Sequence, residues 1–322
     1  MLCRTASDLY WLSRHIERAE NTARFIDFTQ RIALLPARLD PRRAEAASWQ
    51  RALDALGLDK AYEKAHGPPT AGRVLHYLIL DPANPTSIYN CLRYARENGR
   101  AQRGAISAEM YQDLNASWLE INEMAWGQIV SDGVTPFLEW LKTRSAAFRG
   151  VVVGTMGRDE GYNFMRLGTF IERADNTVRL LDIKYAQAEH DEMNAERNIV
   201  EYYQWSAMLQ AISAFETYRK IYRDTVTAER VIELLIYRSD VPRSLATCCE
   251  AMHSILLKLA GGEAIEASRL AGSLSASFRY GRIDDVFEAG MQPFLDGVMQ
   301  RIDTLTLEIV RQFMTSIDVV AN

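Results

Sequence analysis

The chain has 322 residues, of which 48% are hydrophobic and 25% charged, with a formal net charge of −5. This composition is typical of a globular protein, and the length is sufficient to bury a core without disulfides or metals. The mild acidity argues against a nucleic-acid binder, because such proteins usually carry a basic excess. The sequence contains no run of about 18 apolar residues, so we expect no membrane span.

The N-terminal residues lack the apolar core of a secretion signal and include charged side chains at once. The four cysteines, at positions 3, 91, 248 and 249, show no CxxC spacing. Reduced thiols are typical of the cytoplasm. The sequence therefore predicts a cytoplasmic protein.

Apolar residues recur at spacings of three and four along almost the whole chain, which predicts an all-α protein. One such stripe contains Leu12, Ile16, Ala19, Ala23 and Ile26. The breaks between periodic segments are too short for flexible linkers, so we expect residues 1–322 to form a single compact body. The predicted helices cover about 5–33, 41–56, 71–80, 85–102, 107–127, 136–150, 159–188, 198–222, 227–238, 242–260, 264–279 and 284–316.

Residues 16–27 and 171–182 are nearly the same sequence. They read Ile-Glu-Arg-Ala-Glu-Asn-Thr-Ala-Arg-Phe-Ile-Asp and Ile-Glu-Arg-Ala-Asp-Asn-Thr-Val-Arg-Leu-Leu-Asp, and eight of the twelve positions are identical. Weaker matches follow in the same order, of Trp49 with Trp205 and of residues 85–91 with 242–248. This order predicts an internal duplication. One copy covers about 5–150 and the other about 158–316, facing each other about a pseudo-twofold axis, because two copies are too few for a solenoid.

The polar residues of each motif fall on one face of a helix. In the first copy this face carries Arg14, Glu17, Glu20, Asn21, Arg24 and Asp27, with Arg18 just outside it. In the second copy it carries Glu172, Asp175, Asn176, Arg179 and Asp182, with Arg173 equivalent to Arg18. Exposed residues are free to change, since surface substitutions usually cost less than about 0.5 kcal/mol. Retention of the face in both copies therefore predicts specific partners for these side chains.

Three kinds of partner fit this face. The first is internal: Glu17 and Arg24 pair across the axis with Arg179 and Glu172 in a buried ionic network that fixes helix register. The second is a ligand in a central cleft, where guanidiniums bind carboxylate or phosphate and carboxylates bind an amine. That mixture, with arginines and carboxylates in near-equal number, suits an amino acid, a peptide or a phosphorylated intermediate. The third is a metal, which the interleaved arginines and the lack of a Glu-x-x-His pair disfavour, so we expect no metal and no cofactor.

Two other segments are candidates. The Pro-x-Ser sequences at Ser87 and Ser244 read as helix starts in which Asn84 caps and the serine lies in the first turn; the alternative is an anion held at these N-termini with help from Arg243. Arg158 and Asp159 lie close enough to reach the entrance of the second motif helix, although a solvated loop is the simpler interpretation. The candidate ligand-binding residues are thus Arg14, Glu17, Arg18, Glu20, Asn21, Arg24, Ser87, Arg158, Asp159, Glu172, Arg173, Asp175, Asn176, Arg179, Arg243 and Ser244.

The doubled Glu-Arg motif, the Arg158-Asp159-Glu160-Gly161 segment before its second copy and the Pro-x-Ser sequences resemble the Alpha-E family of bacterial all-helical proteins. The resemblance runs from Leu2 to about residue 315. It implies an association with a circularly permuted ATP-grasp protein of the carboxylate–amine ligase type. It also implies a transglutaminase-like cysteine peptidase and a proteasome-like protein as frequent neighbours.

We therefore expect an accessory or substrate-handling component of an ATP-grasp-type peptide or amide ligase system, which binds the ligase, its substrate or its product. The sequence has no P-loop, GxSxG or HExxH motif. One alternative is an enzyme that uses the Glu/Arg cleft as an amidohydrolase or transferase, which requires a carboxylate of raised pKa. The other is a structural scaffold in which the motif is an ionic lock, with every motif Glu and Arg paired internally and no pocket.

Overall fold

The structure, a computed structural model, describes residues 1–34, 41–188 and 195–315. These residues form sixteen helices and no strands, so the predicted all-α class is confirmed. The first eight helices are α1 (Cys3–Ala33), α2 (Pro41–Leu56), α3 (Asp59–His66), α4 (Ala71–Ile79), α5 (Ile88–Ala101), α6 (Ala108–Glu123), α7 (Trp126–Asp132) and α8 (Val134–Thr155). The other eight are α9 (Glu160–Ala188), α10 (Ala195–Ala211), α11 (Phe215–Tyr222), α12 (Ala228–Tyr237), α13 (Leu245–Leu259), α14 (Glu266–Tyr280), α15 (Ile283–Ala289) and α16 (Met291–Phe313).

Several predicted helices are interrupted. The predicted segment 198–222 is two helices, because the chain turns at Ser213 with φ of 58°. The segment 284–316 is also two helices, divided at Gly290, where φ is 92° and glycine carries no steric penalty. The short helix α3 was not predicted.

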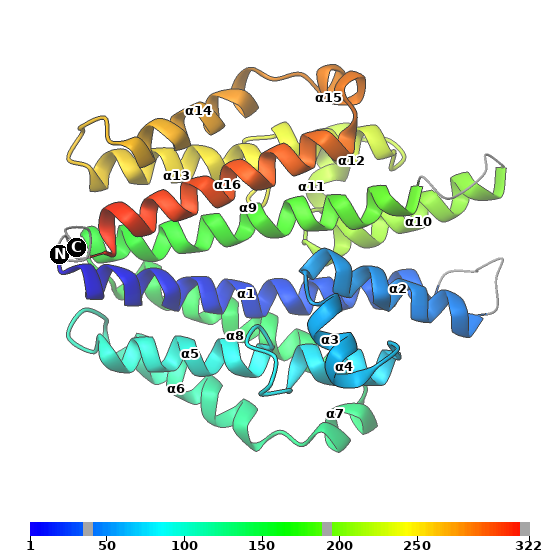
Figure 1. Cartoon of the computed structure of the whole chain (residues 1–322), viewed down its shortest axis with the longest axis horizontal. Helices are drawn as coiled ribbons and strands as arrows, with labels where there is room; N and C mark the ends of the chain where they lie inside the picture. Colours follow the sequence, from blue (N-terminus) through cyan, green and yellow to red (C-terminus); the bar gives the residue numbers. More distant parts are fainter. Residues whose placement is uncertain (35–40, 189–194, 316–322) are drawn as a thin grey trace.

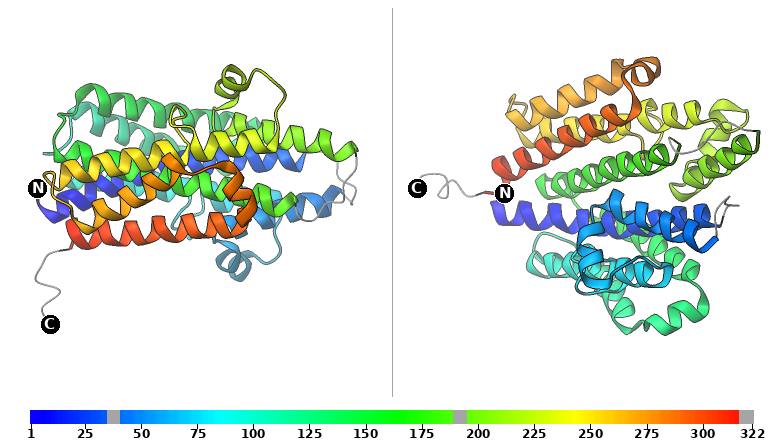
Figure 2. Two further views of the ribbon diagram at one scale, coloured as in Figure 1. Left: turned by 90° about the horizontal axis from the view of Figure 1, so that it is seen from above. Right: turned by 45° about the vertical axis from the view of Figure 1, so that its right-hand side comes forward.

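Helices α1 and α9 run side by side at the centre of the molecule (Figure 1), and their N-terminal ends lie together. Helices α5, α6 and α8 pack on the α1 side, and α13, α14 and α16 pack on the α9 side. The two further views in Figure 2 show the same arrangement. Helix α2 packs against both central helices, and α10 packs against α1. The central pair is thus enclosed by the other helices.

The order of helices α1 to α8 is repeated by α9 to α16, with each pair of bounds separated by a similar number of residues. This order is what an internal duplication produces, and the duplication itself stays a prediction. In this order Thr86, which precedes α5, is equivalent to Arg243, which precedes α13.

A glycine sets the distance between the central helices. A Cβ atom at Gly168 of α9 would lie 2.4 Å from both the Ser13 Oγ and the Tyr10 carbonyl oxygen of α1. The backbones therefore approach closely just before the two glutamate motifs. The predicted apolar stripe from Leu12 to Ile26 is buried beside this contact. None of the helices among the described residues is both long and apolar enough to cross a membrane.

Candidate functional site

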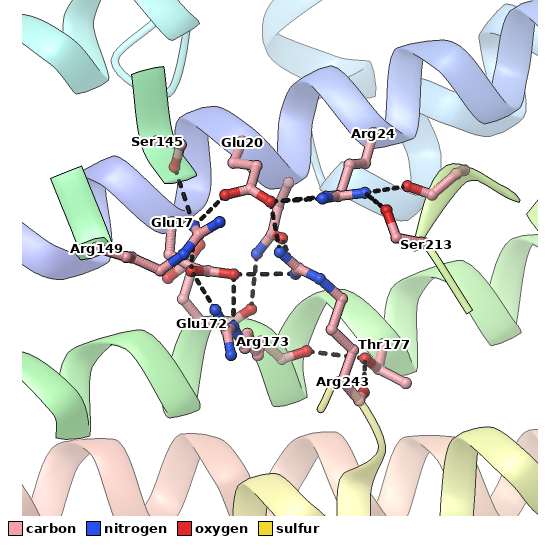
Figure 3. A network of polar contacts seen from close by, with 12 residues as sticks. Glu17, Glu20, Arg24, Ser145, Arg149, Glu172, Arg173, Thr177, Ser213 and Arg243 are labelled. Atoms are coloured by element: carbon pink, nitrogen blue, oxygen red, sulfur yellow. Dashed lines mark hydrogen bonds and ion pairs between the residues drawn. The ribbon is translucent and has the colours of Figure 1, made fainter. Parts of the chain in front are cut away.

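The polar faces of α1 and α9 meet in a buried network of ion pairs (Figure 3). The Arg173 Nε lies 2.8 Å from the Glu17 Oε1, and the Arg18 Nε lies 2.6 Å from the Glu172 Oε1. Asn21 donates from Nδ2 to the Glu172 carbonyl oxygen at 3.1 Å. The two motifs therefore face each other, as predicted. However, the surface where they meet is filled by their own side chains, so the open space lined by motif residues lies beside this surface and not between the motifs.

The predicted pairing of Glu17 with Arg179 and of Arg24 with Glu172 is also wrong. Because α1 and α9 are parallel, equivalent residues lie at the same height, and a residue seven positions on lies about 10 Å farther along the axis. Glu17 instead pairs with Arg173, and Glu172 pairs with Arg18. Each of these arginines directly follows the glutamate of its own copy.

Arg24 and Arg179 each cap the C-terminus of a helix from the other half of the chain. Arg24 binds Glu20 at 2.8 Å and donates from Nη1 to the carbonyl oxygen of Ala211, at the end of α10, at 2.6 Å. Arg179 binds Asp175 at 2.7 Å and donates to the carbonyl oxygen of Ala55, near the end of α2, at 2.7 Å. Cations at these C-termini satisfy carbonyl groups that have no partner within the helix.

Two further arginines pair their guanidiniums with carboxylates of the first motif. Arg243, which precedes α13, lies 2.9 Å from Glu17 and 2.7 Å from Glu20. Arg149 of α8 contacts the same two carboxylates (Figure 3). At the equivalent positions of the other half are Thr86 and Thr306. Sequence reasoning missed Arg149, because it lies outside the repeated motif and next to buried Phe148 on an amphipathic helix.

The three motif glutamates are charged despite their burial. Glu17 is 1%, Glu20 0% and Glu172 4% exposed. Burial raises the pKa of a carboxyl group, but the neighbouring arginines hold the pKa of Glu17 and Glu20 below the usual value and lower that of Glu172 to about 2. Burial also opposes the charge of Arg18 and Arg173, yet the paired glutamates raise the pKa of both. None of these carboxyl groups is suited to donate a proton near neutral pH.

The network carries more positive than negative charge, because Arg149 and Arg243 join it from outside the motifs. Seven arginines are paired with four carboxylates. The arginines are Arg14, Arg18, Arg24, Arg149, Arg173, Arg179 and Arg243, and the carboxylates are Glu17, Glu20, Glu172 and Asp175.

Two pockets open beside the network. Pocket A, of about 180 Å³, lies against Glu17 between α1, α8 and α9, and includes Arg149, Arg166 and Arg173 among mostly apolar residues. Pocket B, of about 270 Å³, lies against Glu172 on the other side of the central pair. The charged residues of pocket B are Arg14, Arg18, Arg179, Glu172, Asp175 and Asp303, beside Thr86 and three leucines.

The two Pro-x-Ser serines act as helix caps and line neither pocket. Ser87 Oγ accepts from the Asn90 N–H at 3.2 Å, and Ser244 Oγ accepts from the Thr247 N–H at 3.1 Å. Helix α5 begins at Ile88, so the serine is the N-cap, and the prediction that Asn84 caps this helix is wrong.

Arg158 and Asp159 lie on the surface, outside the network. Asp159 accepts from the Tyr162 N–H at 3.0 Å, which caps the start of α9. Arg158 stacks 4.2 Å from the centre of the Tyr162 ring and donates to the Val153 carbonyl oxygen. Asn176 is buried on α9. Among the residues that the structure describes, no group of three or more His, Cys, Asp or Glu side chains is arranged to hold a metal ion.

Comparison with known proteins gives a family but no activity. Residues 1–314 match the Alpha-E family model, described as a predicted alpha-helical domain with a conserved ER motif. Uncharacterised proteins of Mycobacterium bovis and Mycobacterium tuberculosis are 26% identical over 275 residues, which is 80% of this chain. The match spans only 30% of the length of those relatives. No solved structure matches the chain. With residues 1–314 matched, the chain belongs to the Alpha-E family.

Proposed function

We propose that this protein is a substrate-handling component of an ATP-grasp-type peptide or amide ligase system, and that pocket B holds a zwitterionic amino acid or the end of a peptide. The observation that carries the proposal is the balanced charge of this pocket, where three arginines and three carboxylates line about 270 Å³. A zwitterion of small size matches both signs, whereas a simple anion or cation matches only one.

Each charged group of pocket B has a distinct part in this proposal. The side chains of Arg18 and Arg179 are 26% and 30% exposed, so their guanidiniums are accessible to a carboxylate. Asp303 lines the pocket and offers its carboxylate to an ammonium group, with Asp175 beside it held by Arg179 through both oxygens. Glu172 is buried and binds Arg14 and Arg18, so it positions these arginines.

Comparison of the two halves supports a cation-binding part of the pocket. Arg243 places its guanidinium against Glu17 and Glu20. At the equivalent position near Glu172 and Asp175 the side chain is Thr86, which is too short to fill the same space and instead lines pocket B. A ligand ammonium group takes the place of the missing guanidinium.

The ligase context rests on family membership and on the relatives' length. The resemblance implies a circularly permuted ATP-grasp protein as partner and a transglutaminase-like protein as a second one. In the mycobacterial relatives the matched segment is 30% of a longer chain, which leaves room for further domains in the same polypeptide.

A structural lock is the second candidate function, because the glutamates and arginines of both motifs have internal partners. An enzyme is less well supported, since the motif glutamates have lowered pKa values. Burial raises the pKa of Asp113, but this residue pairs with Arg144 and lines neither pocket.

The ligand part of the proposal is tested by calorimetric titration of the purified chain with Ala-Ala, N-acetyl-Ala-Ala and Ala-Ala amide. We expect saturable binding of the free dipeptide and about tenfold weaker binding when either end is blocked, since each end loses a charge-assisted contact. The variant Thr86→Arg places a guanidinium in pocket B and abolishes binding, whereas Thr86→Ser retains it. Equal binding of blocked and free dipeptides, or no effect of Thr86→Arg, contradicts the proposal and favours the structural lock.

The partner part is tested by co-purification of the tagged protein from its native cells, followed by mass spectrometry. We expect an ATP-grasp protein among the partners, with Thr86→Arg leaving its capture unchanged. Recovery of the chain without any ATP-grasp protein contradicts the ligase context, and leaves the ligand part to be judged by the titration.

A further inference from the structure

Pocket A differs from pocket B in its lining. Most of its walls are apolar, with Ile16 from α1, Phe148 and Val152 from α8, and Met165 and Phe170 from α9. Its volume of about 180 Å³ exceeds that of an engineered apolar cavity of about 150 Å³ that binds benzene. The pocket therefore has room for a group as large as a leucine or phenylalanine side chain.

The polar side of pocket A carries an excess of positive charge. Arg149, Arg166 and Arg173 line it with a single carboxylate, Glu17. That carboxylate is already bound by Arg173 at 2.8 Å and by Arg243 at 2.9 Å. A ligand cation would meet three guanidiniums and no free carboxylate, whereas a ligand anion would meet favourable charge.

Each of these three arginines has guanidinium N–H groups that can donate to a ligand. Arg149 makes its bonds to Glu17, Glu20 and Ser145 through Nη1 alone. Arg173 uses Nε and Nη2 for Glu17. Arg166 stacks on the rings of Phe170 and Tyr162, and within the described ranges it is paired with no carboxylate.

The equivalent positions in the other half carry different side chains. There Trp11 and Arg14 stand at the positions of Arg166 and Thr169, and the Arg14 guanidinium lies 4.9 Å from the Trp11 ring while it binds Glu172. In pocket A the shorter Thr169 leaves this space open, and the charge comes from Arg149 on another helix. Pocket A therefore has an apolar wall where the other half has the stacked pair of Trp11 and Arg14.

We infer that pocket A is a second binding site, for a carboxylate that carries an apolar group of leucine or phenylalanine size. The apolar walls bury this group, and Arg166 with Arg149 binds the carboxylate, since a guanidinium donates to both of its oxygens. The carboxylate belongs either to a free acid or to the C-terminal residue of a peptide. This inference does not depend on the function proposed for pocket B.

The test is calorimetric titration of the full chain with 4-methylpentanoate, 4-methylpentanamide, acetate and inorganic phosphate. We expect saturable binding of the acid, about tenfold weaker binding of the amide through loss of the charged contact, and none of acetate or phosphate. N-acetyl-Gly-Leu and its C-terminal amide then distinguish the sources. Tighter binding of the peptide than of 4-methylpentanoate assigns a peptide C-terminus, and the reverse order assigns a free acid.

Three variants test whether the acid binds in pocket A. Arg166→Gln should weaken binding of the acid about tenfold without affecting that of the amide. Val153→Trp should block both, because Val153 lines the pocket yet is 56% exposed and tolerates a larger side chain. Arg158→Gln is the matched control, since Arg158 also stacks on Tyr162 but does not line the pocket.

Arg158→Gln and Thr86→Arg should both bind the acid as the unchanged protein does. Equal binding of acid and amide, binding of phosphate, or acid binding that survives both Arg166→Gln and Val153→Trp overturns the inference. Failure of the Ala-Ala titration at pocket B leaves it intact, because the two sites share no lining residue.

Discussion

Two buried titratable residues make the free energy of unfolding depend on pH. The folded state lowers the pKa of His15 from 6.5 to about 4, chiefly by burial, and it lowers that of Glu172 from 4.5 to about 2, where Arg18 and Arg14 outweigh burial. In each case the unfolded chain binds the proton more readily. Stability is therefore lost as pH falls from 6.5 to 4 through His15, and from 4.5 to 2 through Glu172.

Urea unfolding at a series of pH values checks this expectation. His15→Phe, which copies the equivalent Phe170, should flatten the decline in unfolding free energy between pH 6.5 and 4. Glu172→Gln should lower stability at neutral pH by about 3 kcal/mol, because it leaves buried arginines without their carboxylate, and should flatten the decline between pH 4.5 and 2. An unchanged slope in either variant would show that the residue does not contribute to acid unfolding.

The motif residues of α1 and α9 show how far a helical pattern can predict a site. The angle of each motif residue around its helix is fixed by sequence, and the two faces do meet. The height of one helix against the other is set by packing, notably at Gly168, so the predicted partners of Arg24 and Arg179 were wrong. Arg149 comes to pocket A, beside Arg166 of α9, only through the packing of α8 on α1, which no motif encodes.

At the scale of elements, the close contact of α1 and α9 depends on Gly168. Gly168→Ala should force the helices apart and cost about 1–3 kcal/mol, the usual range for overpacking, because its Cβ meets the Tyr10 backbone. Gly150→Ala on α8 is the matched control, since nothing lies within 4 Å of a Cβ there, and it should stabilise by about 0.5–1 kcal/mol through helix propensity. Thermal unfolding of the two variants measures both effects; equal shifts would mean that the central helices can separate without cost.

Helix ends were less predictable than helix faces. Gly290 marks the break between α15 and α16 by its positive φ, yet the continuous apolar pattern hid it. The break after α10 has no glycine or proline, and it is stabilised by Arg24 of α1, which binds the Ala211 carbonyl and the Ser213 hydroxyl. Such a break is a tertiary feature, so local sequence alone does not reveal it.

At the scale of the whole molecule, the chain carries a net charge of −5 around a cation-rich central network. Pockets A and B, of about 180 and 270 Å³, are smaller than the roughly 300–1,000 Å³ of most cofactor and drug sites. Sites for ATP combine backbone N–H groups, a Lys or Arg and carboxylates that hold magnesium. In pocket B the carboxylates alternate with arginines that repel magnesium, and in pocket A apolar walls exclude a triphosphate.

We therefore expect the purified chain neither to bind ATP with micromolar affinity nor to hydrolyse it, with or without magnesium. Titration with magnesium and ATP, run beside Ala-Ala and 4-methylpentanoate, should give no saturable heat for the nucleotide. When a co-purified partner is added, ATP binding should appear, and it should be unaffected by Thr86→Arg because the nucleotide lies on the partner. Saturable ATP binding by the chain alone would overturn the accessory role and make an enzyme built on this Glu/Arg network the better explanation.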